Sequence, residues 1–277
     1  MKNLVLRTVT GVLFVAIVVA SILLYDVTKI PFYVLMLLVS VGGTWEFLKM
    51  AGVLRRWPQS IFAMLVSAMI AMVPLLVSDF DLLAVFFCNI PFLFFFIVLF
   101  AMELFRKEQG TSPLQVVALY LLPPFWIAIP VSLMGIVVSV KEPLLLALFI
   151  IIWLNDTLAY CAGSLFGRHK LCERISPKKT WEGFIIALVL TVAASVSFAF
   201  IGYFTDAVQW YPLQWAGFAL VSVLFGTLGD LVESMVKRSC GVKDSGNILP
   251  GHGGILDRFD SMLMAVPAGA LYAFLLA

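Results

Sequence analysis

Charged residues are scarce in this sequence of 277 residues. Lys, Arg, Asp and Glu make up 12% of the chain, whereas hydrophobic residues make up 62%. A soluble domain usually contains roughly 25% charged residues, and a disordered chain contains few hydrophobic ones. The composition therefore excludes both classes. Because the apolar residues run continuously instead of alternating with polar ones, it also excludes an outer-membrane barrel. We predict an all-α, polytopic integral membrane protein.

Cysteine is also rare. The chain contains four cysteines, with no Cys-x-x-Cys pair, at positions Cys88, Cys161, Cys172 and Cys240. Cys88 and Cys161 lie in apolar segments, and without a Cys-x-x-Cys pair the spacing indicates neither a disulfide framework nor a structural zinc site. We therefore predict free thiols.

The charged residues divide the chain into nine apolar segments, and we predict a transmembrane helix in each. Crossing the hydrocarbon core takes about 20 residues. The predicted segments are 8–25, 30–45, 57–78, 82–102, 109–140, 143–163, 183–205, 207–229 and 261–277. The first one resembles a signal peptide, but its length favours an uncleaved span. The prolines within 109–140 predict a kinked helix there.

The positive charges lie mostly on one side of the predicted membrane. The loops 46–57, 103–112, 168–182 and 237–258 contain 14 Lys and Arg residues, and the loops on the other side contain 2. Loops rich in Lys and Arg stay in the cytoplasm. We therefore predict a cytoplasmic N-terminus and two large basic loops on the cytoplasmic face. We divide the chain into an N-terminal transmembrane scaffold, 1–140, and a C-terminal catalytic region, 141–277, within one membrane domain.

Segment 229–260 contains the densest set of charged residues. On a helix, Asp230, Glu233, Ser234 and Lys237 share one face, with Arg238 at its border. Such a stripe at a span end has two explanations. It either solvates the end of the helix or forms part of a functional site, since acids at the membrane often have a function.

A glycine-rich turn follows the stripe and precedes the last predicted helix. It contains Gly253 and Gly254, and exposed backbone N–H groups of such a turn can bind phosphate. His252, between glycines, is either an acid–base group or a partner for a loop carbonyl. Asp257 and Asp260 then fall three residues apart on the first turn of that helix, and clustered carboxylates favour a hard cation such as Mg²⁺ over zinc.

Two further polar groups stand earlier in the chain. Lys178 and Lys179 lie in the basic loop 168–182, where lysines serve either membrane topology and anionic-lipid contact or the clamping of a polyphosphate. Asp156 shares a helix face with Tyr160 and Gly163. This face predicts either a tight helix contact or the wall of a polar cavity, and the acid favours the cavity.

These segments together resemble the signature of the phosphatidate cytidylyltransferases, also called CDP-diacylglycerol synthases. The resemblance covers the second half of the chain closely and the first half only in its apolar character. Its residues are Asn155-Asp156-x3-Tyr160-x2-Gly163, Ser176-Pro177-Lys178-Lys179-Thr180-Trp181-Glu182-Gly183, and Ser234-x2-Lys237-Arg238-x4-Lys243-Asp244-x-Gly246-x3-Pro250-Gly251-His252-Gly253-Gly254-x2-Asp257-Arg258-x-Asp260.

The resemblance implies the reaction of CTP with phosphatidic acid to give CDP-diacylglycerol and pyrophosphate. It implies Mg²⁺ as cofactor, with a second cation as an option, and a site at the cytoplasmic face of a bacterial inner membrane. The attacking phosphate monoester is already ionised, with a second pKa of about 6, so no strong base is needed. The expected partners are CTP, phosphatidic acid and membrane lipid, with a homodimer as an option and no nucleic acid.

Spacing and resemblance together assign the candidate roles. The catalytic set is Asp230, Lys237, Asp257, Arg258 and Asp260, of which the three acids bind metal. The substrate-binding set is Asp156, Lys178, Lys179, Ser234, Arg238, Lys243, Asp244, His252, Gly253 and Gly254.

Three other functions compete with this interpretation. A CDP-alcohol phosphotransferase would contain an Asp-Gly and Ala-Arg signature ahead of its later acids, and no such run occurs. A CTP-dependent lipid-alcohol kinase shares the substrate and the metal. A transporter would place acids near mid-bilayer on several spans, whereas the polar groups here gather at one face.

Overall fold

The computed structural model describes residues 2–76, 82–106, 112–248, 251 and 253–276. Each of the nine predicted apolar segments contains helix. Among the described residues, five helical segments are long and apolar enough to cross a membrane, namely Ile30–Met50, Trp57–Leu75, Pro113–Phe166, Trp181–Phe200 and Pro212–Ser239. The chain is therefore an all-α membrane protein, as predicted, and the number of crossings stays a prediction.

Large apolar side chains remain exposed along these helices. Leu38 is 59% exposed, Leu65 56% and Val189 59%. An exposed apolar surface of this kind suits contact with lipid rather than water. Cys161, Cys172 and Cys240 are free thiols, as predicted, and the side chain of Cys88 lies outside the described residues.

The chain forms two compact units. Unit 1 comprises Met1–Ile136 and Asp244–Arg258, and unit 2 comprises Val137–Lys243 and Phe259–Ala277. Segment 244–258, which contains much of the glycine-rich signature, therefore belongs to the same unit as the N-terminal helices. The predicted division at residue 140 separates a scaffold from a catalytic region by function. The two compact units do not test it, and it stays a prediction.

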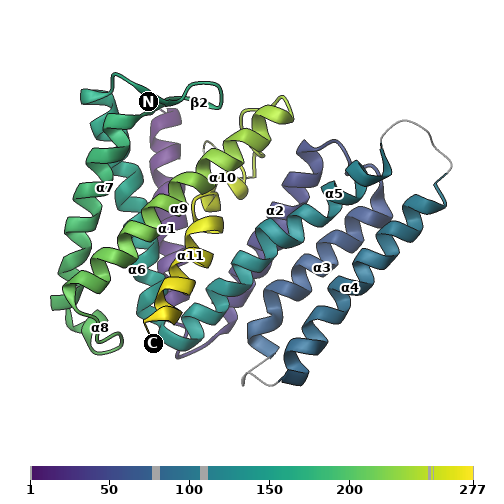
Figure 1. Cartoon of the computed structure of the whole chain (residues 1–277), viewed down its shortest axis with the longest axis horizontal. Helices are drawn as coiled ribbons and strands as arrows, with labels where there is room; N and C mark the ends of the chain where they lie inside the picture. The colour runs from purple at the N-terminus through teal and green to yellow at the C-terminus, as the bar shows by residue number, and fades with distance from the viewer. Residues whose placement is uncertain (1, 77–81, 107–111, 249–250, 252, 277) are drawn as a thin grey trace. The chain divides into compact units, whose positions relative to one another are not determined.

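Unit 1 is a layer of neighbouring helices (Figure 1). It contains α1 (Lys2–Leu23), α2 (Ile30–Met50), α3 (Trp57–Leu76), α4 (Leu82–Leu104), α5 (Pro113–Pro123), the π-helical turn η1 (Pro124–Ala128) and the start of α6 (Ile129–Phe166). Hydroxyl groups link α2 to α3, because Ser40 Oγ donates to the Ser67 carbonyl at 2.8 Å and Thr44 Oγ1 donates to Ser67 Oγ at 3.0 Å. Such short polar side chains let two apolar helices approach closely.

The proline-rich segment is irregular, as predicted. The adjacent Pro123 and Pro124 lack N–H donors, and the helix widens into the π-turn η1 directly after Pro123. A second break occurs at Lys141, whose φ of −152° and ψ of 90° are not helical. This residue begins the predicted outer loop 141–142, so α6 consists of two helices that meet at a kink.

Unit 2 is organised around the long helix α9 (Pro212–Ser239). The unit also contains the rest of α6, α7 (Trp181–Ser195), the 3₁₀ segment η2 (Val196–Phe200), α8 (Gly202–Thr205) and α11 (Met262–Leu275). α9 packs against α7 and α11 (Figure 1). The wholly buried Trp215 near its start contacts the rings of Phe198, Phe204 and Phe218. This aromatic cluster anchors one end of α9 and leaves the polar stripe at the other.

A β-hairpin stands where the sequence predicted only a basic loop. Strand β1 (Lys170–Cys172) pairs antiparallel with β2 (Ser176–Thr180). The pairing residues are Lys170 with Thr180 and Cys172 with Ser176. Three- and five-residue strands leave almost no periodic signal, which is why the pattern of charges concealed them. Thr180 ends β2 and caps α7, because its Oγ1 accepts the Gly183 N–H at 3.2 Å.

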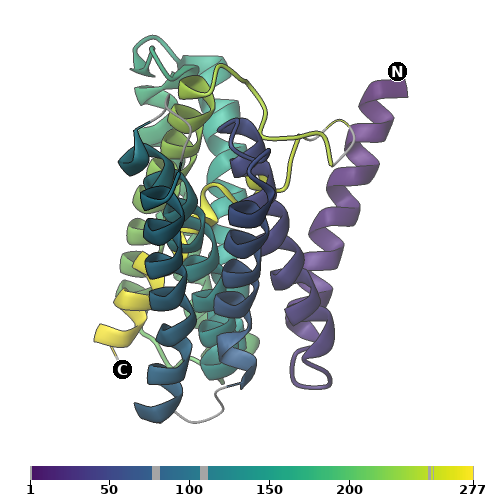
Figure 2. The same cartoon turned by 90° about the vertical axis from the view of Figure 1, so that its right-hand side faces the viewer.

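The two acids Asp257 and Asp260 do not share one continuous helix, which corrects the prediction. Asp257 lies in the short α10 (Leu256–Phe259), the chain turns at Asp260, and α11 begins at Met262. Before α10, Ser245 and Ile255 lie beside the C-terminal part of α2 in unit 1, where each donates a hydrogen bond to Glu46 (Figure 2).

Candidate functional site

The polar stripe at the end of α9 is buried on one side. Glu233 is 0% exposed, and Ser234 and Lys237 are each 9% exposed. Lys237 forms an ion pair with Glu233, and Ser234 Oγ donates to Asp230 Oδ1 at 3.3 Å. A helix end that is merely solvated would leave these groups in water, so burial favours the functional explanation of the stripe.

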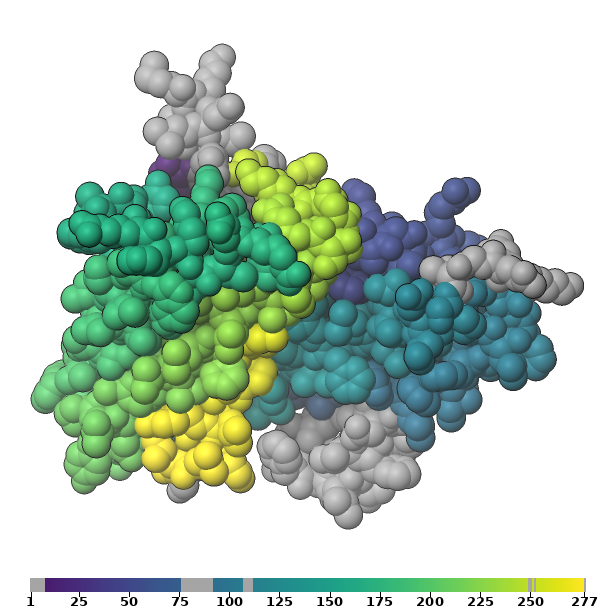
Figure 3. Space-filling model, turned by 45° about the horizontal axis from the view of Figure 1, so that its top comes forward, coloured from purple at the N-terminus to yellow at the C-terminus, as the bar shows by residue number. Residues whose placement is uncertain are grey.

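The hairpin brings Lys179 to this stripe, where its ammonium group forms an ion pair with Asp230 Oδ2. Side chains alternate along a strand, so the adjacent Lys178 points the other way and is exposed. Arg238 also joins the end of α9 to the hairpin, since its Nε donates to the Ile175 carbonyl at 3.4 Å. In the space-filling view, the hairpin and the C-terminal end of α9 form adjoining parts of one face of unit 2 (Figure 3).

A glycine brings Asp260 to the same stripe. The backbone of Asp260 and Ser261 packs directly against Gly229, where a Cβ atom would lie 3.2 Å from Ser261 Cα. Burial raises the pKa of Asp260 well above its usual value, and the negative charges of Asp230 and Glu233 raise it further. Repulsion among acids of this kind is relieved by a proton or by a bound cation.

Replacing Gly229 by alanine should separate these acids. The new methyl group would meet the backbone of Asp260 and Ser261, which cannot rotate away as a flexible side chain can. We expect a loss of about 1–3 kcal/mol in stability, as for other overpacked cores, and a fall in activity. The control is Gly202→Ala, whose Cβ would meet only Asp206 Oδ2 at 3.9 Å. Thermal unfolding and turnover of both variants measure the difference, and equal effects would contradict the argument.

The helix face that contains Asp156 serves two purposes. Gly163 and Gly183 let α6 and α7 touch, because a Cβ on Gly183 would lie 2.9 Å from the Gly163 Cα atom. Of the two predicted alternatives, a tight helix contact or a cavity wall, this part of the face is therefore the tight helix contact. Asp156 itself is exposed, and its charge also contributes to the raised pKa of Asp260. Asp156 therefore acts on Asp260 in the same direction as Asp230 and Glu233 of α9.

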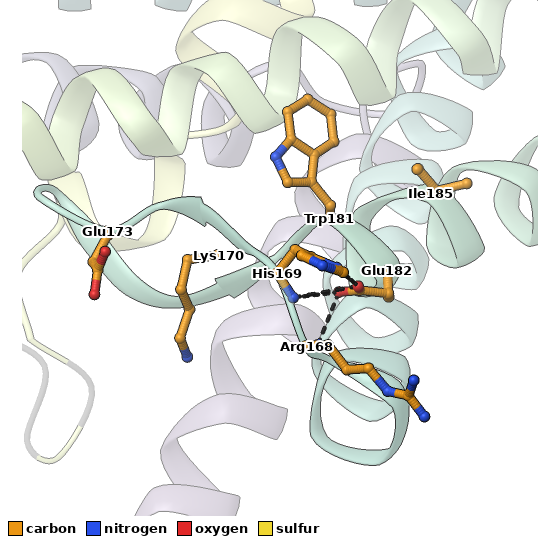
Figure 4. A pocket seen from close by; sticks show the side chains of 7 residues that line it. All are labelled: Arg168, His169, Lys170, Glu173, Trp181, Glu182 and Ile185. Atoms are coloured by element: carbon orange, nitrogen blue, oxygen red, sulfur yellow. Dashed lines mark hydrogen bonds and ion pairs between the residues drawn. The ribbon is translucent and has the colours of Figure 1, made fainter.

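The carboxylate of Glu182 fastens the hairpin to the start of α7 (Figure 4). It accepts the backbone N–H of Arg168 at 3.0 Å and of His169 at 3.1 Å, and it lies 2.6 Å from His169 Nδ1. Around this clamp a pocket is lined by Arg168, Lys170 and Trp181, among others. Cationic groups beside an indole are typical of contact with the membrane interface.

In unit 1, Asp257 organises the glycine-rich segment. Its Oδ2 accepts the Ser245 N–H at 2.9 Å, the Ser245 hydroxyl at 2.9 Å and the Gly254 N–H at 2.8 Å. Gly251 and Gly253 have φ values of 79° and 84°, which favour glycine. His252 lies outside the described residues, so both explanations of it stay predictions.

The other predicted residues of the glycine-rich signature are Lys243, Asp244 and Arg258. Lys243 and Asp244 are exposed. Arg258 is half-buried, and its Nε has no hydrogen-bond partner within the described part of the chain. A buried donor without an acceptor is costly, and an anion such as phosphate would satisfy it.

The acids of the candidate site offer the oxygen ligands that a magnesium ion prefers, but their spacing fits the ion only in part. Within the described residues, no group of three His, Cys, Asp or Glu side chains stands at metal-ligand spacing. Magnesium, however, is usually bound by one or two carboxylates, with water and substrate phosphates completing its shell. Asp230 and Asp260 interact electrostatically and offer the hard oxygen ligands that the ion prefers.

Two residues escaped the sequence-based prediction of the site. Glu46, expected to open an inner loop, instead lies buried within α2. In the sequence Glu182 is part of the motif Ser176–Gly183, and nothing there indicates that it binds the start of the hairpin. A signal existed in both cases, since each is a lone carboxylate that follows a tryptophan at the edge of an apolar segment.

The sequence of this chain is similar to that of known cytidylyltransferases. The model of the family described as "Cytidylyltransferase family" matches residues 5–276. A "Phosphatidate cytidylyltransferase" of Staphylococcus aureus (strain COL) is 52% identical over 119 residues, which cover 43% of this chain and 44% of the relative. A protein of the same name from Haemophilus influenzae is 44% identical over 134 residues, 47% of this chain and 46% of the relative. The aligned region thus spans less than half the length of these relatives.

Proposed function

Because the chain belongs to the cytidylyltransferase family, we propose that it transfers the cytidylyl group of CTP to phosphatidic acid. The products are CDP-diacylglycerol and pyrophosphate. The observation that carries the proposal is the meeting of a basic hairpin with the acids of α9 through Lys179 and Asp230. A nucleoside triphosphate needs both cationic side chains and carboxylates that hold a metal ion.

In the proposed reaction, a phosphate oxygen of phosphatidic acid attacks the α-phosphorus of CTP. The bond from that phosphorus to the oxygen that bridges to the β-phosphorus breaks, and pyrophosphate leaves. The lipid phosphate is ionised near neutral pH, since its second pKa is about 6, so no protein base has to remove a proton. The protein's tasks are to align the two phosphates and to neutralise their charge.

The cationic side chains neutralise the substrates. Lys179 sits at the acids of α9 and can exchange its carboxylate partner for a CTP phosphate. Arg258 offers the buried Nε donor described above. The proposed set also includes Lys178, Lys237 and Arg238. Ser234, Lys243, Asp244 and Asp156 lie at the edge of the proposed site, and Gly253 and His252 at the phosphates. The N–H of Gly254, expected from the sequence to bind phosphate, donates to Asp257 instead.

Asp230, Asp257 and Asp260 are the proposed holders of Mg²⁺. When bound, the ion supplies positive charge to the triphosphate and the leaving pyrophosphate. For Asp230 and Asp260 the assignment is supported by the raised pKa of Asp260, which burial causes first and the charge of Asp230 next. The proposal also includes a second cation as an option.

We further propose nine crossings of a bacterial inner membrane, with the N-terminus and the active site at the cytoplasmic face. The distribution of 14 Lys and Arg residues on one side and 2 on the other supports this orientation. CTP is a cytoplasmic substrate, which agrees with it. A homodimer stays an option.

Replacing Lys179 by alanine should lower kcat/KM for CTP by about 10- to 100-fold, the typical effect of losing one buried hydrogen bond to a charged group. Lys170→Ala is the control, because this lysine lies on the same hairpin but is exposed and lines the pocket around Glu182. Steady-state kinetics with varied CTP measure both variants. Unchanged kinetics of Lys179→Ala would assign this lysine to membrane topology instead.

CTP labelled at its α- or γ-phosphate distinguishes the proposal from a CTP-dependent lipid kinase. We expect label from the α-position in the lipid product and label from the γ-position in pyrophosphate. Transfer of the γ-label to lipid would replace the proposal with the kinase.

A further inference from the structure

Glu46 is a buried carboxylate in the half of the chain that has no recognised signature. It lies near the C-terminal end of α2, and its side chain is 0% exposed. A carboxylate withdrawn from water is costly unless donors surround it. The identity of those donors therefore shows what this residue holds in place.

Three described hydrogen-bond donors to Glu46 come from the glycine-rich signature segment, about 200 positions later. Oε1 accepts the Ile255 N–H at 2.9 Å, and Oε2 accepts the Leu256 N–H at 2.9 Å and the Ser245 hydroxyl at 3.0 Å. The two N–H groups stand at the start of α10, where a helix lacks internal acceptors and where negative charge is favourable. Glu46 thus caps the helix turn that contains Asp257.

Ser245 joins Glu46 to Asp257. Its hydroxyl lies 3.0 Å from Glu46 Oε2 and 2.9 Å from Asp257 Oδ2, and its N–H also donates to Asp257. A hydroxyl has one hydrogen and can donate to only one of the two carboxylates at a time. The position of Asp257 therefore depends on both ends of this network.

The glycines of the signature segment fit around the same carboxylate. A Cβ atom on Gly246 would collide with Glu46, and its three nearest atoms would all belong to that side chain. A Cβ atom on Gly254 would collide with both Glu46 carboxylate oxygens and Ser245 Oγ. The φ of neither glycine is positive, so lack of space rather than backbone conformation excludes a side chain there.

We infer that Glu46 is a positioning residue that holds Ser245 and the turn 253–257, and with them Asp257, in the geometry that the reaction requires. The catalytic part of this inference rests on the proposed function. It also explains two glycines of the signature through a residue outside it. Helix α2 then determines the position of Asp257 within unit 1.

The variant Glu46→Gln tests the inference, because the amide keeps the shape but turns NH₂ toward some of the donors. We expect kcat to fall on the order of 100-fold, as for other misplaced catalytic groups, with little change in the KM for CTP. The backbone amides of Ile255 and Leu256 should exchange hydrogen faster. Unchanged kcat and unchanged exchange would overturn the inference.

Glu103→Gln is the matched control. Glu103 is another buried carboxylate of unit 1, but it pairs with Arg56 and Arg106. If the effect of Glu46 were only loss of stability, the control would reduce kcat to the same extent. We expect it to lower the unfolding temperature while kcat and exchange at residues 255 and 256 stay near those of the wild type.

A double-mutant cycle provides a second test with a variant that keeps the charge. Gly246→Ala should be harmful in the wild type, because the methyl group strikes Glu46. Glu46→Asp shortens the side chain, so in that background the same change should be about 10-fold less harmful to kcat, the size of coupling expected for residues in contact. Additive effects would contradict the steric part of the inference.

Hydrogen exchange separates failure of this inference from failure of the proposed function. If the wild type makes no CDP-diacylglycerol, the proposed function fails, yet exchange at residues 255 and 256 still reports whether Glu46 holds the segment. If the wild type is active and Glu46→Gln alters neither kcat nor exchange, only the inference about Glu46 fails.

Discussion

Replacing Asp230 by asparagine is expected to lower kcat by at least about 1000-fold, which corresponds to ~4 kcal/mol of transition-state stabilisation. Asp230 combines three interactions at the end of α9. It pairs with Lys179, accepts the Ser234 hydroxyl and raises the pKa of Asp260. Asparagine keeps an oxygen for Ser234 but removes the charge, so the variant should fold and insert while it loses activity.

Asp206→Asn is the control for this experiment. Asp206 also belongs to unit 2, but it is exposed and caps the short helix α8. We expect wild-type turnover from this control in an assay of CDP-diacylglycerol formation. Near-normal turnover of Asp230→Asn in magnesium would remove Asp230 from the proposed metal site.

Asp257→Asn is expected to have an effect of similar size, at least about 1000-fold in kcat. The oxygen of asparagine can still accept the hydrogen bonds of Ser245 and Gly254, so these two residues should keep their places. The comparison with Asp257→Ala separates the two roles of this acid. Alanine should abolish turnover and also speed hydrogen exchange at Ser245 and Gly254, whereas asparagine should affect turnover alone.

The outcome that would contradict this account is turnover of Asp257→Asn close to that of the wild type. Asp257 would then be an anchor of the glycine-rich segment without a role at the metal or the phosphates. Equal hydrogen exchange in the asparagine and alanine variants would contradict the anchoring role.

The sequence allowed the helical architecture to be predicted because lipid imposes a simple rule on it. Apolar runs long enough to cross a membrane can satisfy their backbone only as helices, and the charged residues between them mark their ends. Even the irregular segment at Pro123 and Pro124 followed from the missing N–H groups of proline. The stripe from Asp230 to Lys237 was also predictable, because a period of 3.6 places these side chains on one face.

The hairpin was not predictable by the same reasoning. Strands as short as Lys170–Cys172 have no measurable alternation, and their pairing depends on Glu182 holding Arg168 and His169 from outside the strands. The consequence is functional. In sequence, Lys178 and Lys179 are equivalent, whereas the strand directs only Lys179 toward Asp230.

The role of Glu46 was hidden for a different reason. Its partners Ser245, Ile255 and Leu256 are about 200 positions away, and a single sequence contains no information on which distant segments meet. From the sequence, the charge of Glu46 predicts the start of a loop, since charged residues usually mark helix ends in a membrane protein. A buried carboxylate that binds backbone N–H groups is the exception to that rule.

The most direct test of the central proposal is the conversion of CTP and phosphatidic acid by the purified protein in detergent micelles. With magnesium, we expect CDP-diacylglycerol and pyrophosphate in equal amounts. EDTA should abolish both products, and added magnesium should restore them. Absence of CDP-diacylglycerol, with magnesium and well-dispersed phosphatidic acid present, would contradict the account.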